Sequence, residues 1–311
     1  MFGQFFVLFA MIGVGYFANR KQMITPVVNT GIGALVMNFT CPALLFVTIS
    51  TNEIDGGKLK VFFLLVAAQY LASVIGGKLM QIYCRKRGWE EKYWGMLDAT
   101  TATCNNGFIG LPVALLFFGD EAGLYMSAGF FGIHLYLWTY GVRVIQGRGE
   151  KGTSLKETVL KILNPNCVMV FIGLVFSLMG WTGSVPACVM EAMSTLGNMS
   201  TPLSLIYIGA MAGNEGFGRL IRRKEAVETA LVKMVSFPLA TILLVYFLPI
   251  DPLVKTVCVV SMSCPCAAIM PMVVEQYGGT GAEKSSDITL LTTFFSMGVL
   301  PLSIWLCGIL F

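Results

Sequence analysis

Thr100–Pro112 reads TTATCNNGFIGLP and interrupts a long apolar run with two glycines, two asparagines and a proline. A second apolar run contains Ser261–Pro271, which reads SMSCPCAAIMP. Proline removes a backbone donor and clashes with the preceding helical turn, so we expect each run to break into two half-helices. Broken backbone is tolerated at membrane depth only where protein buries it or where it lines a cavity. The two stretches therefore predict a pair of broken membrane spans beside a cavity.

The composition of the whole chain is that of a membrane protein. Its 311 residues are 56% hydrophobic and only 12% charged, and the mean hydropathy is +0.74. A soluble domain carries about 25% charged residues, so a soluble globule is excluded. Nine cysteines, mostly inside apolar runs, indicate neither a disulfide framework nor a metal site. The short loops exclude a separate catalytic or nucleic-acid-binding domain.

Ten apolar segments, bounded by charged residues, glycine and proline, are the predicted membrane spans. They are 2–18, 26–50, 60–82, 93–118, 121–145, 165–180, 186–212, 226–248, 252–277 and 284–310. Most of the 21 lysines and arginines fall in the odd-numbered loops between these segments. The positive-inside rule places those loops in the cytoplasm and both termini outside. We therefore expect a multi-pass protein in the lipid bilayer of the cell (inner) membrane.

The longest polar stretch, 146–163, divides the chain into a first five-span unit, 1–145, and a second, 164–311. Within this stretch Ser154 and Glu157 have the spacing of a capping box, and an apolar stripe follows them. This pattern is typical of a short helix that lies in the membrane interface. We expect it to be a cytoplasmic linker between the two units.

The two units repeat each other in sequence. Asn38–Pro42 reads NFTCP, and Asn198–Pro202 reads NMSTP 160 positions later. Because each unit has an odd number of spans, the second unit enters the membrane from the opposite side. The sequence thus predicts an all-α polytopic membrane protein with ten transmembrane helices in two inverted five-helix repeats. The fourth and ninth helices are the broken ones that cross each other.

The breaks suggest a binding site for a small carboxylate. Free N–H groups at the start of a half-helix attract an anion, and freed carbonyl groups attract a cation. Asn105 and Asn106 add amide groups at one break, and Asn38 and Asn198 are candidates to face the same cavity. The alternative is that the asparagines only bond to backbone and the prolines only kink their helices. The symmetric placement of the breaks favours the binding site.

Titratable residues inside the spans are candidates for proton or ion coupling. His134, the only histidine, is either a proton relay or a neutral side chain bonded to a neighbouring helix. Asp98 is expected close enough to the end of its span for water to reach it. Lys233 lies deeper, and snorkelling of its side chain toward the interface explains it equally well.

The order and spacing of these motifs resemble the auxin efflux carrier family, which includes the plant PIN auxin exporters and bacterial dicarboxylate permeases. The motifs that carry the resemblance are Asn38–Pro42, Asn105 with Gly110-Leu111-Pro112, Asn164-Pro165-Asn166 with Ile172-Gly173-Leu174, Pro265 with Pro271 and Tyr277-Gly278, and Asp287 through Thr292 to Leu300-Pro301-Leu302. The chain lacks the long cytoplasmic loop of the plant carriers. It has Cys104-Asn105-Asn106 where the plant carriers have a proline before the asparagine, which favours a bacterial permease with its own substrate.

The resemblance implies a bile acid/sodium symporter-like fold of the elevator type. Spans 1, 2, 6 and 7 would form a scaffold that mediates a homodimer, and spans 3–5 and 8–10 a transport domain with the substrate at the crossing of spans 4 and 9. The substrate-binding residues at matching or related positions are Asn105, Asn106, Gly107, Pro112, Asn38, Asn166, Asn198, Cys264, Pro265 and Ala268. Where plant relatives place an acid in the third span, this chain has Gln69.

Together these observations predict a secondary active transporter of small organic anions, such as malate, malonate or auxin-like acids. Alternating access would carry the substrate across, with proton or sodium coupling as candidates. An anion channel and a membrane sensor are the alternatives. Because the chain has no HExxH, GxSxG, Walker A or Rossmann signature, we expect neither an enzyme nor a cofactor.

Overall fold

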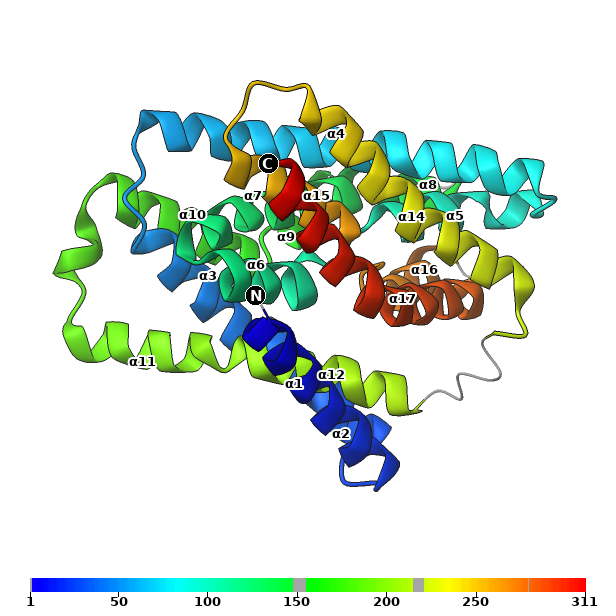
Figure 1. Cartoon of the computed structure of the whole chain (residues 1–311), viewed down its shortest axis with the longest axis horizontal. Coiled ribbons are helices and arrows are strands. Elements are labelled where there is room, and N and C mark those ends of the chain that lie inside the picture. The colour runs from blue at the N-terminus through cyan, green and yellow to red at the C-terminus, as the bar shows by residue number, and fades with distance from the viewer. Residues whose placement is uncertain (1, 148–154, 215–220, 279) are drawn as a thin grey trace. The chain divides into compact units, whose positions relative to one another are not determined.

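The computed structural model describes residues 2–147, 155–214, 221–278 and 280–311 (Figure 1). The described residues form helices joined by short connections, without a β-strand. Four of these helical segments are long and apolar enough to cross a membrane, and they are Pro26–Ser50, Gly56–Lys86, Lys224–Tyr246 and Ala282–Leu310. The bent pair Lys156–Ile162 and Pro165–Leu178, with an angle of 69° between its helices, is a candidate fifth. The polytopic all-α class is therefore confirmed, and the count of ten spans stays a prediction.

The chain forms two compact units, each built from both halves of the sequence. Unit 1 consists of Met1–Leu64, Gly107–Phe131 and Leu163–Gly216, and unit 2 of Leu65–Asn106, Gly132–Ile162 and Phe217–Phe311. Two helices, α4 (Gly56–Lys86) and α7 (Asp120–Tyr136), begin in unit 1 and end in unit 2.

Unit 1 is a bundle of short and medium helices. Its complete elements are α1 (Phe2–Arg20), α2 (Pro26–Leu35), the π-helix Val36–Thr40, α3 (Cys41–Ser50), α6 (Leu111–Phe118), α10 (Pro165–Leu178), the 3-10 helix Trp181–Ser184, α11 (Ala187–Asn198) and α12 (Ser200–Asn214). Helix α1 packs along α12, and α3 packs against α10 and α11 (Figure 1). Prolines begin several of these helices, where the missing N–H costs no hydrogen bond.

Two glycines allow α1 and α12 to approach closely. A Cβ atom at Gly15 would collide with the carbonyl oxygen of Ile206, and a Cβ atom at Gly209 would collide with the carbonyl oxygen of Ile12. In lipid, helices gain little from burying apolar surface against each other, so they depend on this kind of close backbone packing. The glycine pair therefore stabilises unit 1.

We expect Gly15→Ala to destabilise the protein by about 1–3 kcal/mol, the usual cost of an extra methyl group in a tightly packed site. Gly13→Ala on the same helix is the matched control, because a Cβ atom there would meet no atom within 4 Å. The melting temperature (Tm) of each purified variant in detergent checks the prediction. Equal values for the two variants would contradict it.

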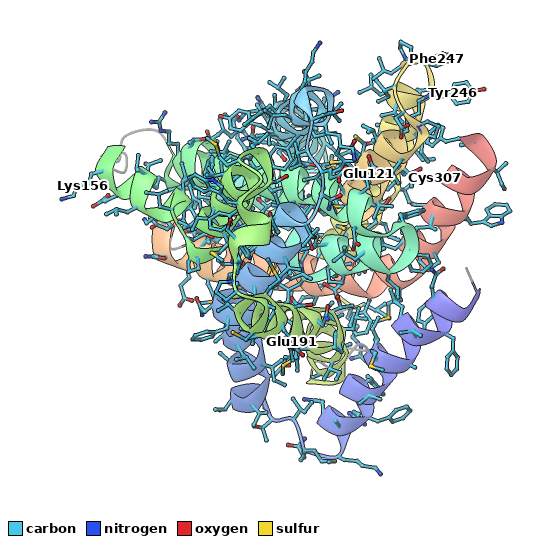
Figure 2. The ribbon with its side chains drawn as sticks, turned by 90° about the vertical axis from the view of Figure 1, so that its left-hand side faces the viewer. Glu121, Lys156, Glu191, Tyr246, Phe247 and Cys307 are labelled. Atoms are coloured by element: carbon cyan, nitrogen blue, oxygen red, sulfur yellow. The ribbon has the colours of Figure 1, made fainter. Side chains whose placement is uncertain are left out.

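Unit 2 is organised around α17 (Ala282–Leu310). Its other complete elements are the 3-10 helix Glu91–Tyr93, α5 (Trp94–Ala102), the π-helix Leu137–Gly141, α8 (Val142–Gln146), α9 (Leu155–Ile162), α14 (Lys224–Tyr246), α15 (Pro252–Ser263) and α16 (Met270–Gly278). Helix α17 contacts α5, α14, α15 and α16. Figure 2 shows Cys307 of α17 near α14, where it packs with Val245 and Val259, while Tyr246 and Phe247 extend away from the end of α14.

Helix α9 lies where the sequence predicts the linker helix between the two halves of the chain. The proposed capping residue Ser154 falls outside the described residues, and Glu157 lies in the first turn. Lys156 extends outward from this helix (Figure 2). The ammonium group of Lys161 lies 4.1 Å from the ring centroid of Tyr277 on α16. The helix is present, and its location in the membrane interface stays a prediction.

Candidate functional site

Two extended segments cross in unit 2, where both proline-containing stretches leave the helical conformation. Helix α5 ends at Ala102, and α15 ends at Ser263. Between them the backbone N–H of Asn105 donates to the carbonyl of Pro265 at 2.8 Å, and the N–H of Ala267 donates to the carbonyl of Thr103 at 2.7 Å. These bonds form an antiparallel bridge between Cys104 and Cys266. We call residues 103–106 and 264–269 the crossing.

The crossing has both kinds of helix end. Helices α5 and α15 run into it with their C-terminal carbonyl groups, and α16 starts after it at Met270. From the segment 103–106 the chain continues into the π-helix Asn106–Gly110 and then α6. The C-terminal ends carry partial negative charge and the N-terminal ends partial positive charge. The site therefore offers backbone groups to a cation and to an anion.

A buried chain of hydrogen bonds supports the crossing. The amide Nδ2 of Asn106 donates to the hydroxyl of Ser261 at 2.7 Å, and that hydroxyl donates to Oε1 of Gln69 at 2.7 Å. The hydroxyl of Ser73 donates to the carbonyl of Ala102 at 3.1 Å, at the end of α5. These bonds hold α4, α15 and the crossing together and fix the orientation of the Asn106 amide.

One amide oxygen at the crossing is left open. The Oδ1 atom of Asn106 is buried and, among the described residues, has no hydrogen-bond partner. Such a group costs free energy unless a ligand, a water molecule or an ion satisfies it. Asn105, the preceding residue in the same segment, is also buried. Two adjacent amides thus lie at the crossing, one of them with an acceptor available.

Lys233 lies at the carbonyl end of α15. Its side chain is completely buried, and its ammonium group donates to the carbonyl of Cys264, the C-terminal capping residue of that helix. Snorkelling toward the membrane surface would have left the ammonium group exposed. The snorkelling interpretation is therefore wrong, and Lys233 belongs to the crossing.

A second buried charge, Asp98, forms an ion pair instead of facing water. The expectation that water reaches it is wrong, because its side chain is 0% exposed. The Nζ atom of Lys78 lies 2.9 Å from Oδ2 of Asp98, and the hydroxyl of Tyr136 donates to Oδ1 at 3.1 Å. Gly77 makes room for this pair, since a Cβ atom there would collide with Oδ1.

The remaining predicted residues divide between the two units. In unit 2, Cys264 is buried in the crossing, Ala268 is half-buried in the connection before α16, and His134 is half-buried on α7. Unit 1 contains Gly107, Pro112, Asn38, Asn166 and Asn198. Asn105, Asn106, Gln69, Cys264, Pro265, Ala268 and Lys233 are thus the predicted residues that the structure brings together in and around the crossing.

Asn38 and Asn198 are both exposed, whereas the hydroxyl residues of the same motifs, Thr40 and Ser200, are completely buried. The amide of Asn38 donates to the carbonyl of Ala34, one turn earlier, at 2.9 Å. Asn166 is buried and donates to the carbonyl of Met37 at 2.9 Å. In these two contacts, Asn38 and Asn166 bond to backbone carbonyls of unit 1.

A groove of about 380 Å³ lies between α4 and α14 in unit 2. Its walls are mostly apolar and include Ile75, Leu79, Phe237, Leu244 and Met262. The sulfur of Met262 accepts a hydrogen bond from Gln69, so the groove adjoins the polar network of the crossing. An apolar lining offers little to a carboxylate, and the crossing is therefore the better candidate site.

Charged residues at one end of α14 and α17 form a separate cluster. The guanidinium group of Arg223 pairs with Glu283 at 2.7 Å and with Asp287, and Lys284 pairs with Glu225 at 3.2 Å. Hydrogen bonds to the two carboxylates raise the pKa of Arg223 above its ordinary value. This cluster joins the starts of the two helices and is distinct from the crossing.

Sequence reasoning missed Lys78, Tyr136 and Ser73 as partners of the buried polar groups. The available signal was the presence of a lysine in the third predicted span and an aspartate in the fourth, two opposite charges inside apolar segments. Such groups pair with each other when they lie inside a membrane. The tyrosine and the serine carry no comparable signal.

Comparison with known proteins agrees with a membrane transporter. The chain is similar to an uncharacterized transporter of Methanothermobacter thermautotrophicus, 24% identical over 273 residues, which cover 86% of this chain and 85% of the relative. It is also similar to an uncharacterized transporter of Methanocaldococcus jannaschii, 22% identical over 309 residues, 96% of each chain. Residues 1–306 match the family described as membrane transport proteins, to which the auxin efflux carriers belong. The chain therefore belongs to this auxin efflux carrier-like family of membrane transport proteins.

Proposed function

We propose that the protein is a secondary active transporter of small organic anions, with carboxylates such as malate, malonate or auxin-like acids as substrates. The observation that carries this proposal is the crossing, in which two broken segments meet beside the buried amide side chains of Asn105 and Asn106. Soluble enzymes and receptors have no need of two broken helices at membrane depth. Transporters use them to bind a substrate between half-helices.

The chemistry of the crossing favours an anion. Amide groups of Asn105 and Asn106 and the ammonium group of Lys233 are all hydrogen-bond donors there, and the start of α16 adds a partial positive charge. Lys233 takes part in none of the ion pairs between described side chains. A carboxylate bound at the crossing would complete the charge balance of this buried cation.

The division into two units supports alternating access by an elevator-like movement. Unit 1 contains the predicted spans 1, 2, 6 and 7, together with 107–118 of span 4 and 121–131 of span 5, and unit 2 contains the crossing. In the proposed mechanism unit 2 carries the substrate, while unit 1 is the scaffold and forms a homodimer. The inverted repeat is supported by the two related motifs Asn38–Pro42 and Asn198–Pro202, because the regular α-helix is interrupted at both. The π-helix Val36–Thr40 interrupts the first copy, and a turn at Met199 interrupts the second. The expected location is the inner membrane with both termini outside.

Transport by purified protein in liposomes tests the proposal. Radiolabelled malate, malonate, other dicarboxylates and aromatic acids are offered with and without sodium and with and without a pH gradient. We expect saturable uptake of at least one carboxylate, accelerated by the same unlabelled acid on the opposite side. Unitary currents with unsaturable flux would instead indicate a channel. No uptake of any acid above that of empty liposomes would contradict the proposal.

A further inference from the structure

The most unusual charged group in the described residues is the ammonium of Lys233. It is completely buried and donates to the carbonyl of Cys264, at the point where α15 ends and the crossing begins. Its other close contacts are with the sulfur of Met234 at 3.8 Å and with the ring of Phe237, whose centroid is 5.6 Å away. No described carboxylate forms an ion pair with it.

A helix end of this kind is a natural place for a cation. The last carbonyl groups of a helix lack intrahelical partners and form its negative pole. In transporters with broken helices, such ends and the unwound carbonyl groups beside them coordinate sodium ions or protons. The carbonyl of Cys264 is such a group, and Asn106 contributes an open amide oxygen to the same crossing. The ammonium of a lysine is a compact single positive charge with three donors, so it can satisfy the same oxygen atoms.

We propose that Lys233 is a resident cation that takes the place of a coupling sodium ion, so that substrate binding at the crossing requires no sodium. The predicted consequence, sodium-independent uptake, rests on the proposed transport function. The assignment of Lys233 to a cation site rests only on its contact with the end of α15. Removal of the ammonium group would leave that end without its positive charge and open to a sodium ion.

A simpler role for Lys233 is that of a helix cap, which predicts a different response to salt. Loss of a cap lowers stability equally in sodium and in any other monovalent salt. Loss of a resident cation also lowers stability, but sodium then restores part of it, because an ion that binds only the folded protein stabilises it by mass action. The sodium dependence of stability therefore distinguishes the two roles.

The experiment compares the Tm of purified Lys233→Met with that of the parent protein, in rising sodium chloride or in choline chloride at the same ionic strength. Methionine has a similar length and no charge. We expect the Tm of the variant to rise by about 3 °C in saturating sodium relative to choline, and that of the parent to be the same in both salts.

Lys255→Met is the matched control. The ammonium of Lys255 lies 3.4 Å from the carbonyl of Tyr246, at the end of α14, so it also contacts the C-terminal end of a helix. Lys255 is partly exposed, however, and water can replace its ammonium group. We expect the Tm of this variant to show no difference between sodium and choline.

Two results would overturn the inference. One is a folded Lys233→Met protein with the same Tm in both salts, and the other is a parent protein that sodium itself stabilises. If Lys233→Met does not fold, Lys233→Gln is used, since its amide still donates to the Cys264 carbonyl without a charge. The Tm measurements are made without substrate, so they test the cation site independently of the carboxylate uptake experiment. A failure to detect uptake of any carboxylate would not contradict the assignment of Lys233. Carboxylate uptake by a parent protein that sodium stabilises would leave the transport function standing and remove only this inference.

Discussion

Asn105→Ala and Asn106→Ala are each expected to lower carboxylate uptake by about 10- to 100-fold. A hydrogen bond to a charged group contributes about 1.5–3 kcal/mol, and its loss from the bound state weakens binding by that factor. Both side chains are buried at the crossing, and the amide NH2 group of Asn106 has two donor hydrogens, one of which it donates to Ser261. Initial uptake rates in liposomes with equal amounts of folded protein measure the effect.

The matched control for these variants is Asn52→Ala. Asn52 lies in unit 1, where its amide donates to the carbonyl of Thr48 at 2.6 Å and to the carbonyl of Asp120 at 3.3 Å, whereas the crossing belongs to unit 2. We expect uptake by this variant within about twofold of the parent, because it loses hydrogen bonds within unit 1 and no substrate contact. Asn106→Asp adds a sharper test, since a carboxylate of similar size would repel an anionic substrate. Parent-like uptake by all three crossing variants would place the substrate elsewhere.

The sequence predicted the breaks because proline and glycine act locally. Pro265 lies in the second break itself, whereas Pro112 lies in the first turn of α6, after the π-helix that follows the first break. Prolines of this kind disturb a helix wherever the rest of the chain lies, so they mark the broken spans without knowledge of the fold. The family also follows from sequence, because several short motifs occur in the same order along the whole chain. The confirmed parts of the prediction, the all-α membrane class and the family, both depend on such local or ordered patterns.

The direction in which a side chain points was harder to predict. Asn38 and Thr40 are two positions apart, so on a helix they lie on roughly opposite sides. The motif does not indicate which side faces the protein. The structure buries Thr40 and exposes Asn38, and it does the same with Ser200 and Asn198. The polar residue that looked more important for binding is the exposed one in both copies.

The partners of buried charges were also beyond sequence reasoning. Whether a lysine inside a span snorkels or stays buried depends on what its neighbours on other helices offer. Lys233 donates to the carbonyl of Cys264, 31 positions later in the chain, and Asp98 forms an ion pair with Lys78 on α4. Periodicity within one helix contains no information about such contacts, because they depend on how separate helices pack.

Lys78→Met is expected to destabilise the protein by about 3 kcal/mol. Removal of one partner from a buried ion pair costs about 3–5 kcal/mol, because the other charge remains buried without compensation. The value should lie near the lower limit, since the side chain of Lys78 is 44% exposed and only that of Asp98 is completely buried. The hydroxyl of Tyr136 remains as a hydrogen-bond donor to Asp98 and does not supply the missing positive charge. A fall in Tm in detergent measures the loss.

Two further variants separate the ion pair from general effects of losing a lysine. Lys58→Met removes a pair with Glu121 at the start of α7, in which both side chains are partly exposed and the charged atoms are 3.5 Å apart. Such surface pairs contribute about 0–1 kcal/mol, so this variant should retain nearly the parent Tm. The double variant Lys78→Met with Asp98→Leu removes both charges and should recover much of the loss, because no buried charge then lacks a partner. If the double variant is less stable than Lys78→Met alone, the cost comes from packing and the ion pair is not its cause.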